Sequence, residues 1–182
     1  MTKSMTGSFY LTETVTIPPG NPTNNRVQST VDLSAYVNVP TGQAIAIESV
    51  DFIHQIGLDF GTDVKQMLVA NGAISTQLTD LNPGVQLIRA DGQSLIASAG
   101  LNIDVLNNVA SHSSDFYPDN FGPANLSEAF LVVNDTLYLT TGNDSAVTGA
   151  TNLSVTARIR CRVVKLAVKD WMAIAIQSTA EA

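Results

Sequence analysis

Residues 153–166 read LSVTARIRCRVVKL, and polar and apolar side chains alternate along nearly the whole segment. Successive side chains of an extended strand point to opposite faces, so this alternation predicts a long β-strand with one face in a hydrophobic core. At ~3.3 Å per residue the strand would span on the order of 45 Å. Its apolar face consists of Val155, Ala157, Ile159, Cys161 and Val163.

Residues 43–56 show the same alternation, but the apolar positions change phase within the segment. They are odd-numbered at the start, as at Ile45, and even-numbered later, as at Phe52. A strand whose apolar set moves from one parity to the other needs an extra residue to keep facing the core. We therefore expect a β-bulge near Glu48 and Ser49.

Turn-forming dipeptides divide the other apolar segments. Asn71-Gly72 and Asp91-Gly92 favour the left-handed φ values of two-residue hairpin turns, and Asn134-Asp135 is a weaker signal because it lacks glycine. Together these patterns predict about nine or ten short strands, as in an all-β sandwich or barrel. The expected strands cover residues 9–17, 27–33, 43–56, 67–70, 74–78, 85–90, 94–97, 130–133, 136–139 and 153–166.

Three segments depart from the strand pattern. Residues 1–7 are polar and are interpreted as an N-terminal arm, and residues 100–127 are interpreted as one long loop. Residues 168–180 are the one good helix candidate, because Trp171 and Ile174 recur at helical spacing. No linker or repeat divides the chain, so residues 1–182 are expected to form a single domain.

The composition favours contact with other protein chains. Charged residues make up only 14% of the chain while hydrophobic residues make up 45%, and charges are depleted at the cores of protein interfaces. A secreted β-domain is the alternative interpretation. The net charge of −7 argues against a nucleic-acid partner, whose phosphates require a basic surface. No apolar run approaches ~20 residues and the first seven residues contain no apolar signal-peptide core, so neither a membrane span nor a secretory leader is expected.

The sequence offers little for catalysis. The two histidines, His54 and His112, fall in different settings: His54 on the apolar face of residues 43–56, typical of a core or interface histidine, and His112 in the expected long loop. A triad can be written from Ser94, His112 and Asp115, but no G-x-S-x-G elbow accompanies it. We expect no enzyme activity, no catalytic residue and no cofactor.

The sequence evidence for a metal site is equally weak. Cys161 is the only cysteine, so no spacing of cysteine and histidine matches a zinc site. Asp59 with Asp63, or Asp115 with Asp119, offers oxygen ligands for calcium, but neither pair matches the EF-hand loop. Loop aspartates are more often turn formers, and no metal is expected.

One cluster of basic residues stands out in this acidic chain. Arg158, Arg160 and Arg162 alternate along the last strand and so share one face, with Lys165 and Lys169 just beyond; these are five of the nine basic residues. The arginines either pair with acidic residues of a neighbouring strand or form a basic stripe facing an anionic partner, such as another subunit or lipid headgroups.

The order of several segments carries a resemblance. A short polar arm precedes FYLTETVTI at residues 9–17; then follow VDLSAY at 31–36, IAIESVDF at 45–52, and ARIRCRVVKL at 157–166 before the expected helix. This series resembles the small single jelly-roll major capsid proteins of tailless icosahedral viruses with an internal membrane, of the haloarchaeal and thermophilic-bacterial type.

That resemblance implies a virion location and a structural role. The chain would form an upright eight-stranded jelly roll that self-assembles into capsomers, with room for a second, related capsid protein and for contact with the internal membrane. Trp171 is the candidate anchor of a subunit interface, since tryptophan is enriched at interface hot spots, or else packs the helix onto its own domain. The alternative function is an extracellular carbohydrate-binding or adhesin-like β-sandwich, against which the aromatic content of only 6% argues.

Overall fold

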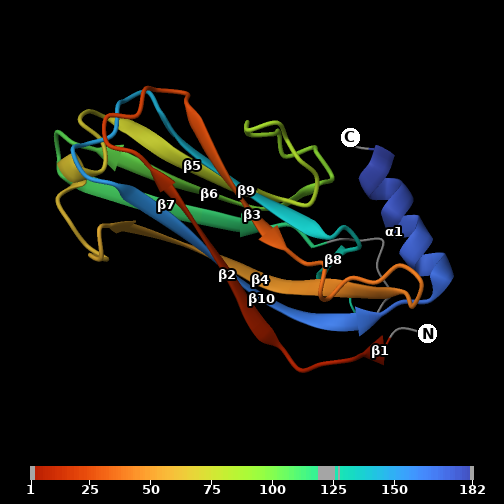
Figure 1. The fold of residues 1–182 in the computed structure, drawn as a ribbon. Coiled ribbons are helices and arrows are strands. Elements are labelled where there is room, and N and C mark those ends of the chain that lie inside the picture. The colour runs from red at the N-terminus through yellow and green to blue at the C-terminus, as the bar shows by residue number, and fades with distance from the viewer. Residues whose placement is uncertain (1–2, 119–125, 127, 181–182) are drawn as a thin grey trace.

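A computed structural model describes residues 3–118, 126 and 128–180 of the chain. Strands dominate it, and one α-helix follows the last strand (Figure 1). The elements are β1 (Lys3–Ser4), β2 (Phe9–Ile17), β3 (Arg26–Asp32), β4 (Gln43–Ile56), the 3-10 helix η1 (Val64–Gln66), β5 (Gly72–Thr79), β6 (Leu95–Asp104), β7 (Val109–Phe116), β8 (Phe130–Val132), β9 (Thr136–Asp144), β10 (Leu153–Lys165) and α1 (Val168–Ala180).

The strands form two antiparallel five-stranded sheets that stack face to face (Figure 1). In the first sheet, β1 and β2 pair with one edge of β10, and β4 and β8 follow on its other side. The second sheet has the order β3-β9-β5-β6-β7. The chain changes sheet between β2 and β3, β3 and β4, β4 and β5, β7 and β8, β8 and β9, and β9 and β10, which is the double Greek-key connectivity of a jelly roll. The expected all-β jelly-roll sandwich with a short C-terminal helix is confirmed.

The main core lies between the sheets and follows the alternation seen in the sequence. Every second residue of β10 from Leu153 to Val163 is buried, and these side chains meet apolar residues of both sheets. Each fully buried aliphatic side chain stabilises the fold by roughly 1.5–3 kcal/mol. The expected bulge is also present: Arg160 pairs with Ser49 and Cys161 with Ile47, which leaves Glu48 as the extra residue of β4.

A second, smaller core covers the outer face of the first sheet. Ala44 and Ala46 of β4 point away from the main core, and α1 packs its Ile174 and Trp171 over that face. The buried members of this second cluster are Ala44, Ala46, Leu126, Ala129, Leu131, Val133, Val164, Leu166 and Ile174. The C-terminal helix is therefore part of the domain's own packing.

The predicted hairpins are wrong. Residues 67–70 and 85–90 lie in loops, so neither Asn71-Gly72 nor Asp91-Gly92 joins two paired strands. Short apolar runs bounded by glycine resemble strands, yet Met67 and Leu68 are buried within a loop. Asn134-Asp135 does separate two strands, but β8 and β9 belong to different sheets. This dipeptide therefore forms a corner between sheets.

The prediction of one long loop at residues 100–127 is also wrong for most of that segment. β6 continues to Asp104, and β7 returns beside it after a turn in which Asn108 has a φ of 54°. β7 escaped prediction because it is a solvent-exposed edge strand rich in serine, without an apolar face. Residues 119–125 and 127 of the expected loop lie outside the described residues.

The N-terminal arm lies against the sheet from its first described residue. Lys3 and Ser4 form β1 opposite Lys165 and Val164, and the Met5 amide donates a hydrogen bond to the Val163 carbonyl at 2.8 Å. The edge of β10 thus has two partners in succession, β2 and β1.

Candidate functional site

The three arginines of the predicted stripe lie on the outer face of β10, and Glu48 of β4 is the acidic residue that pairs with two of them. The Glu48 carboxylate is 3.4 Å from the Arg160 guanidinium and 3.6 Å from that of Arg162. It also accepts a hydrogen bond from the Ser8 hydroxyl at 2.6 Å. The β-bulge brings this carboxylate to the arginines, because Glu48 is the residue without a partner in the β4–β10 ladder. Two of the three arginines therefore pair with an acid of the neighbouring strand.

The remaining basic residues of the stripe face solvent. Arg158 stacks its guanidinium over the Tyr10 ring at 5.1 Å from the ring centroid, a cation–π contact, and Lys165 is exposed at the end of β10. Neither side chain forms an ion pair with any described residue. The stripe is thus partly neutralised at Arg160 and Arg162, with cationic groups remaining at Arg158 and Lys165.

Trp171 packs within its own domain. Its indole lies against the second cluster, beneath α1, and its Nε1 is buried without a hydrogen-bond partner among the described residues. An adjoining, exposed side of α1 is apolar as well. Val168, Met172 and Ile176 recur at every fourth residue and are 72%, 53% and 64% exposed.

The structure brings together two histidines that the sequence placed in different settings. His54 lies on the inward face of β4, alternating with the buried Phe52 and Ile56, and His112 lies on β7 opposite the buried Leu101. Their ring centroids are 5.4 Å apart and the rings are inclined at 73°. Each ring comes from a different sheet, so only the stacking of the sheets creates this pair.

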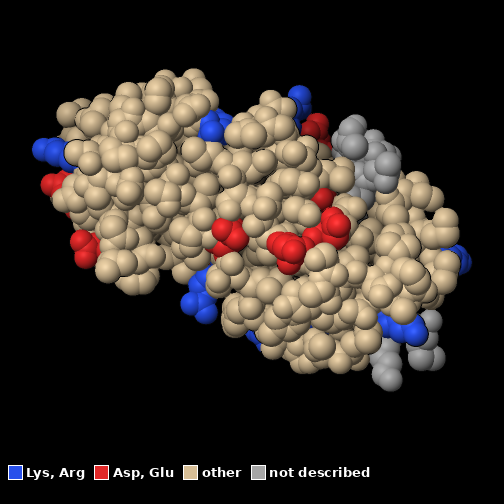
Figure 2. Space-filling model, in the orientation of Figure 1, with Lys and Arg blue, Asp and Glu red and all other residues tan. Residues whose placement is uncertain are grey.

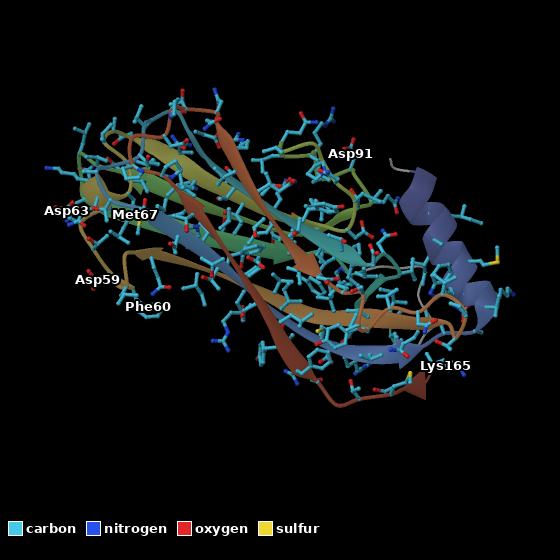
Figure 3. The ribbon with its side chains drawn as sticks, in the orientation of Figure 1. Asp59, Phe60, Asp63, Met67, Asp91 and Lys165 are labelled. Atoms are coloured by element: carbon cyan, nitrogen blue, oxygen red, sulfur yellow. The ribbon has the colours of Figure 1, made fainter. Side chains whose placement is uncertain are left out.

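The histidine pair lies in a cleft of about 400 Å³ at one open edge of the sandwich. β8 pairs only with Ile45, Ala46 and Ile47, so most of this edge of β4 has no strand partner among the described residues. Figure 3 shows Phe60 and Met67 at this end of the molecule, far from Lys165. The cleft is lined by Phe52, Ile53, His54, Phe60, Gly61, Thr62, Met67, Leu101, Ala110 and His112.

The His54 imidazole is held in an apolar environment. Burial lowers its pKa from 6.5 to about 4, and the nearby His112 adds a smaller effect in the same direction. Its Nε2 atom is buried and has no hydrogen-bond partner among the described residues. His54 is therefore neutral at pH 7, with a polar atom directed into protein rather than water. The period-two pattern placed His54 on the apolar face, but its partner was missed because β7 was interpreted as loop.

The arrangements considered for catalysis and calcium are not assembled. His112 is opposite Leu101 on β6, about 20 Å along the strand from Ser94 at ~3.3 Å per residue, and His112 and Asp115 point to opposite faces of β7. Asp63 accepts a hydrogen bond from the Lys65 amide at 3.0 Å and caps η1, while Asp119 lies outside the described residues. Across residues 3–118, 126 and 128–180, no three histidine, cysteine or acidic side chains are grouped to hold a metal ion.

Comparison with known proteins leaves the fold and the surface as the guide to function. The described part of the chain contains no helix with the length and apolar character needed to cross a lipid bilayer. No model of a known protein family matches the chain, and no curated protein has a significantly similar sequence.

Proposed function

We propose that this protein is a structural subunit that assembles with copies of itself into a shell, and that the shell is the capsid of a virus. Jelly-roll domains occur both in viral capsids and in lectins, so the topology alone does not choose between a shell protein and a glycan-binding module. The choice rests on the surface of the molecule.

The observation that carries the proposal is that α1 is apolar on two sides. Trp171 and Ile174 pack inward, while Val168, Met172 and Ile176 form an exposed apolar stripe on the outer side. The solvent-facing part of a surface helix is normally polar, so an exposed apolar stripe departs from the usual pattern. The outer side of α1 therefore favours burial against another protein chain.

The rest of the surface supports contact with protein. Charged residues are only 14% of the chain, and most of the face in Figure 2 belongs to uncharged residues. Leu58 and Phe60 add exposed apolar side chains, 90% and 76% exposed. Figure 3 shows Phe60 at the opposite end of the sandwich from α1. A glycan-binding surface would present several aromatic rings, whereas aromatic residues are only 6% of this chain. Because Arg160 and Arg162 pair with Glu48, the arginine stripe contributes less to such a contact than α1 does.

Size-exclusion chromatography followed by negative-stain electron microscopy tests the proposal. Purified protein is expected to form rings, sheets or closed cages as its concentration is raised through the micromolar range. A protein that stays monomeric across concentration, pH and salt would overturn the shell proposal. Binding of that monomer to a glycan array would instead support the carbohydrate-binding module.

A further inference from the structure

His54 and His112 form a pair that the shell role does not use. Both imidazoles line the cleft at the open edge of the sandwich, His54 from the inward face of β4 and His112 from the exposed edge strand β7. An imidazole pair in an apolar cleft is a set of nitrogen ligands already held close together.

The separation of the rings matches joint coordination of one metal ion. A late first-row transition metal binds imidazole nitrogen at about 2.0–2.1 Å, so two rings on a tetrahedral ion have centroids about 5 Å apart. The observed separation is 5.4 Å. The buried Nε2 of His54 has no hydrogen-bond partner among the described residues, and a buried polar atom of this kind calls for a ligand.

The cleft gives a metal ion access to the two rings. The cleft is open to solvent beside Phe60, whose side chain is 76% exposed, and this opening provides an entry path.

The lining of the cleft selects among metals. It contains two imidazoles and the thioether of Met67, but no carboxylate and no thiolate. Neutral ligands leave the charge of a divalent ion uncompensated, whereas a monovalent ion requires less compensation. Thioether is a soft ligand that favours Cu⁺.

We propose that His54 and His112 bind a single copper(I) ion in this cleft, with Met67 as a third, softer ligand. The site joins the free edge of β4 to the edge strand β7, so bound copper links the two sheets where no strand pairing does. Cys161, the single cysteine of the chain, pairs with Ile47 on β4 while His54 pairs with Val155 of β10, about 20 Å away along the strand. Burial raises the pKa of the Cys161 thiol to about 12, so it supplies no thiolate at neutral pH.

The test is a competition titration of the full chain with Cu⁺ under anaerobic conditions, using a chromophoric Cu⁺ chelator as indicator. The wild type is expected to take up one Cu⁺ per chain. His54→Phe and His112→Phe, which keep an aromatic ring in place, are expected to weaken binding by about tenfold or more. Met67→Leu, which conserves volume, is expected to weaken Cu⁺ binding by less. Cys161→Ala is the matched control and should bind Cu⁺ as the wild type does.

Circular dichroism and thermal melting of each variant establish that it is folded before titration. Equal Cu⁺ affinity in the wild type and both folded histidine variants would overturn the proposal. So would Cu⁺ binding that disappears in Cys161→Ala. A parallel titration with Zn²⁺, followed by the shift in melting temperature, tests the choice of metal: Zn²⁺ binding tighter than Cu⁺ would overturn the assignment of copper.

Discussion

The carboxylate of Glu48 is held between two arginine side chains on the outer face of the first sheet. Its distances to Arg160 and Arg162 are those of ion pairs, and the Arg162 side chain is only 28% exposed. Removing one partner of a partly buried pair leaves the other charge without compensation. The bulge residue therefore stabilises this face of the fold.

Glu48→Gln is expected to lower the free energy of unfolding by about 1–2 kcal/mol. The loss arises mainly at Arg162, because Arg160 is half exposed and its pairing is screened by solvent. Urea unfolding at low salt measures the change. Asp51→Asn is the control: Asp51 is exposed on the same strand, opposite Arg158, and its substitution should change stability by less than ~0.5 kcal/mol. Equal losses for the two variants would contradict the role given to Glu48.

His54 makes stability depend on pH. Its pKa is about 4 in the folded protein and near 6.5 in the unfolded chain, so between these values the unfolded chain binds more protons. Stability from a neutral buried His54 is present above pH 6.5 and is lost as the pH falls towards 4. The loss between pH 7 and pH 5 is expected to be about 2 kcal/mol.

Urea unfolding of the wild type and His54→Phe at pH 7 and pH 5 isolates this effect. Carboxylates titrate in both proteins and cancel in the comparison, so the wild type should lose about 2 kcal/mol more than the variant. An identical pH dependence in the two proteins would show that His54 is accessible to protons in the folded state.

At the scale of secondary-structure elements, Gly42 joins the start of β4 to the end of β10. Its carbonyl accepts a hydrogen bond from the Leu166 amide at 2.9 Å, and its φ is +73°. A Cβ atom at this position would lie 2.5 Å from the Leu166 carbonyl oxygen. The junction from which α1 departs therefore requires glycine for two reasons, the backbone conformation and the close approach.

Gly42→Ala is expected to destabilise the fold by about 2–4 kcal/mol, because a clash with backbone adds to the strain of a left-handed conformation. Gly20→Ala is the matched control: Gly20 has a φ of +66°, but a Cβ there meets nothing within 4 Å. Thermal melting of both variants separates the two contributions. The close approach to Leu166 would be refuted if Gly20→Ala and Gly42→Ala lost the same stability.

Trp171 couples α1 to the outer face of the first sheet. Trp171→Ala is expected to lower the free energy of unfolding by about 2–3 kcal/mol, because it leaves a cavity in the second cluster. Trp171→Phe retains most of the packing and removes the unpaired buried Nε1–H, so its loss should be smaller. Chemical denaturation measures both. Equal losses would indicate that the indole nitrogen has a partner.

At the scale of the whole molecule, α1 presents one apolar side to its own sheet and another to the outside. Met172→Glu combined with Ile176→Glu is expected to abolish self-assembly while leaving the melting temperature of the subunit nearly unchanged, because both side chains are more than half exposed. Ala173→Glu, also exposed on α1, is the control and should assemble. Light scattering and electron microscopy give the readout. Normal assembly of the double variant would remove α1 from the interface.

Patterns of period two and of helical period were enough to locate the framework of this fold. The alternation of polar and apolar residues predicted β10, β2 and the phase change at Glu48. Side chains on a strand point alternately to the core and to solvent, so the residue types along one strand show which of its faces is buried. The helix at residues 168–180 was predicted for the same reason at its own period. These features depend only on residues that are close together in the sequence, so the pattern of amino-acid types is enough to predict them.

Contacts between segments that are distant in the sequence could not be predicted in this way. β7 has no apolar face, so it is held as a strand by main-chain hydrogen bonds to β6, which carry no signature in the amino-acid sequence. Asn134-Asp135 has the local chemistry of a turn, whether it joins paired strands or crosses between sheets. The pairing of His54 with His112 arises from the stacking of two sheets, and the placement of Glu48 between two arginines from the register of β4 on β10. Such pairings require the packed sandwich, because the partners are separated along the chain and are brought together by burial of other residues.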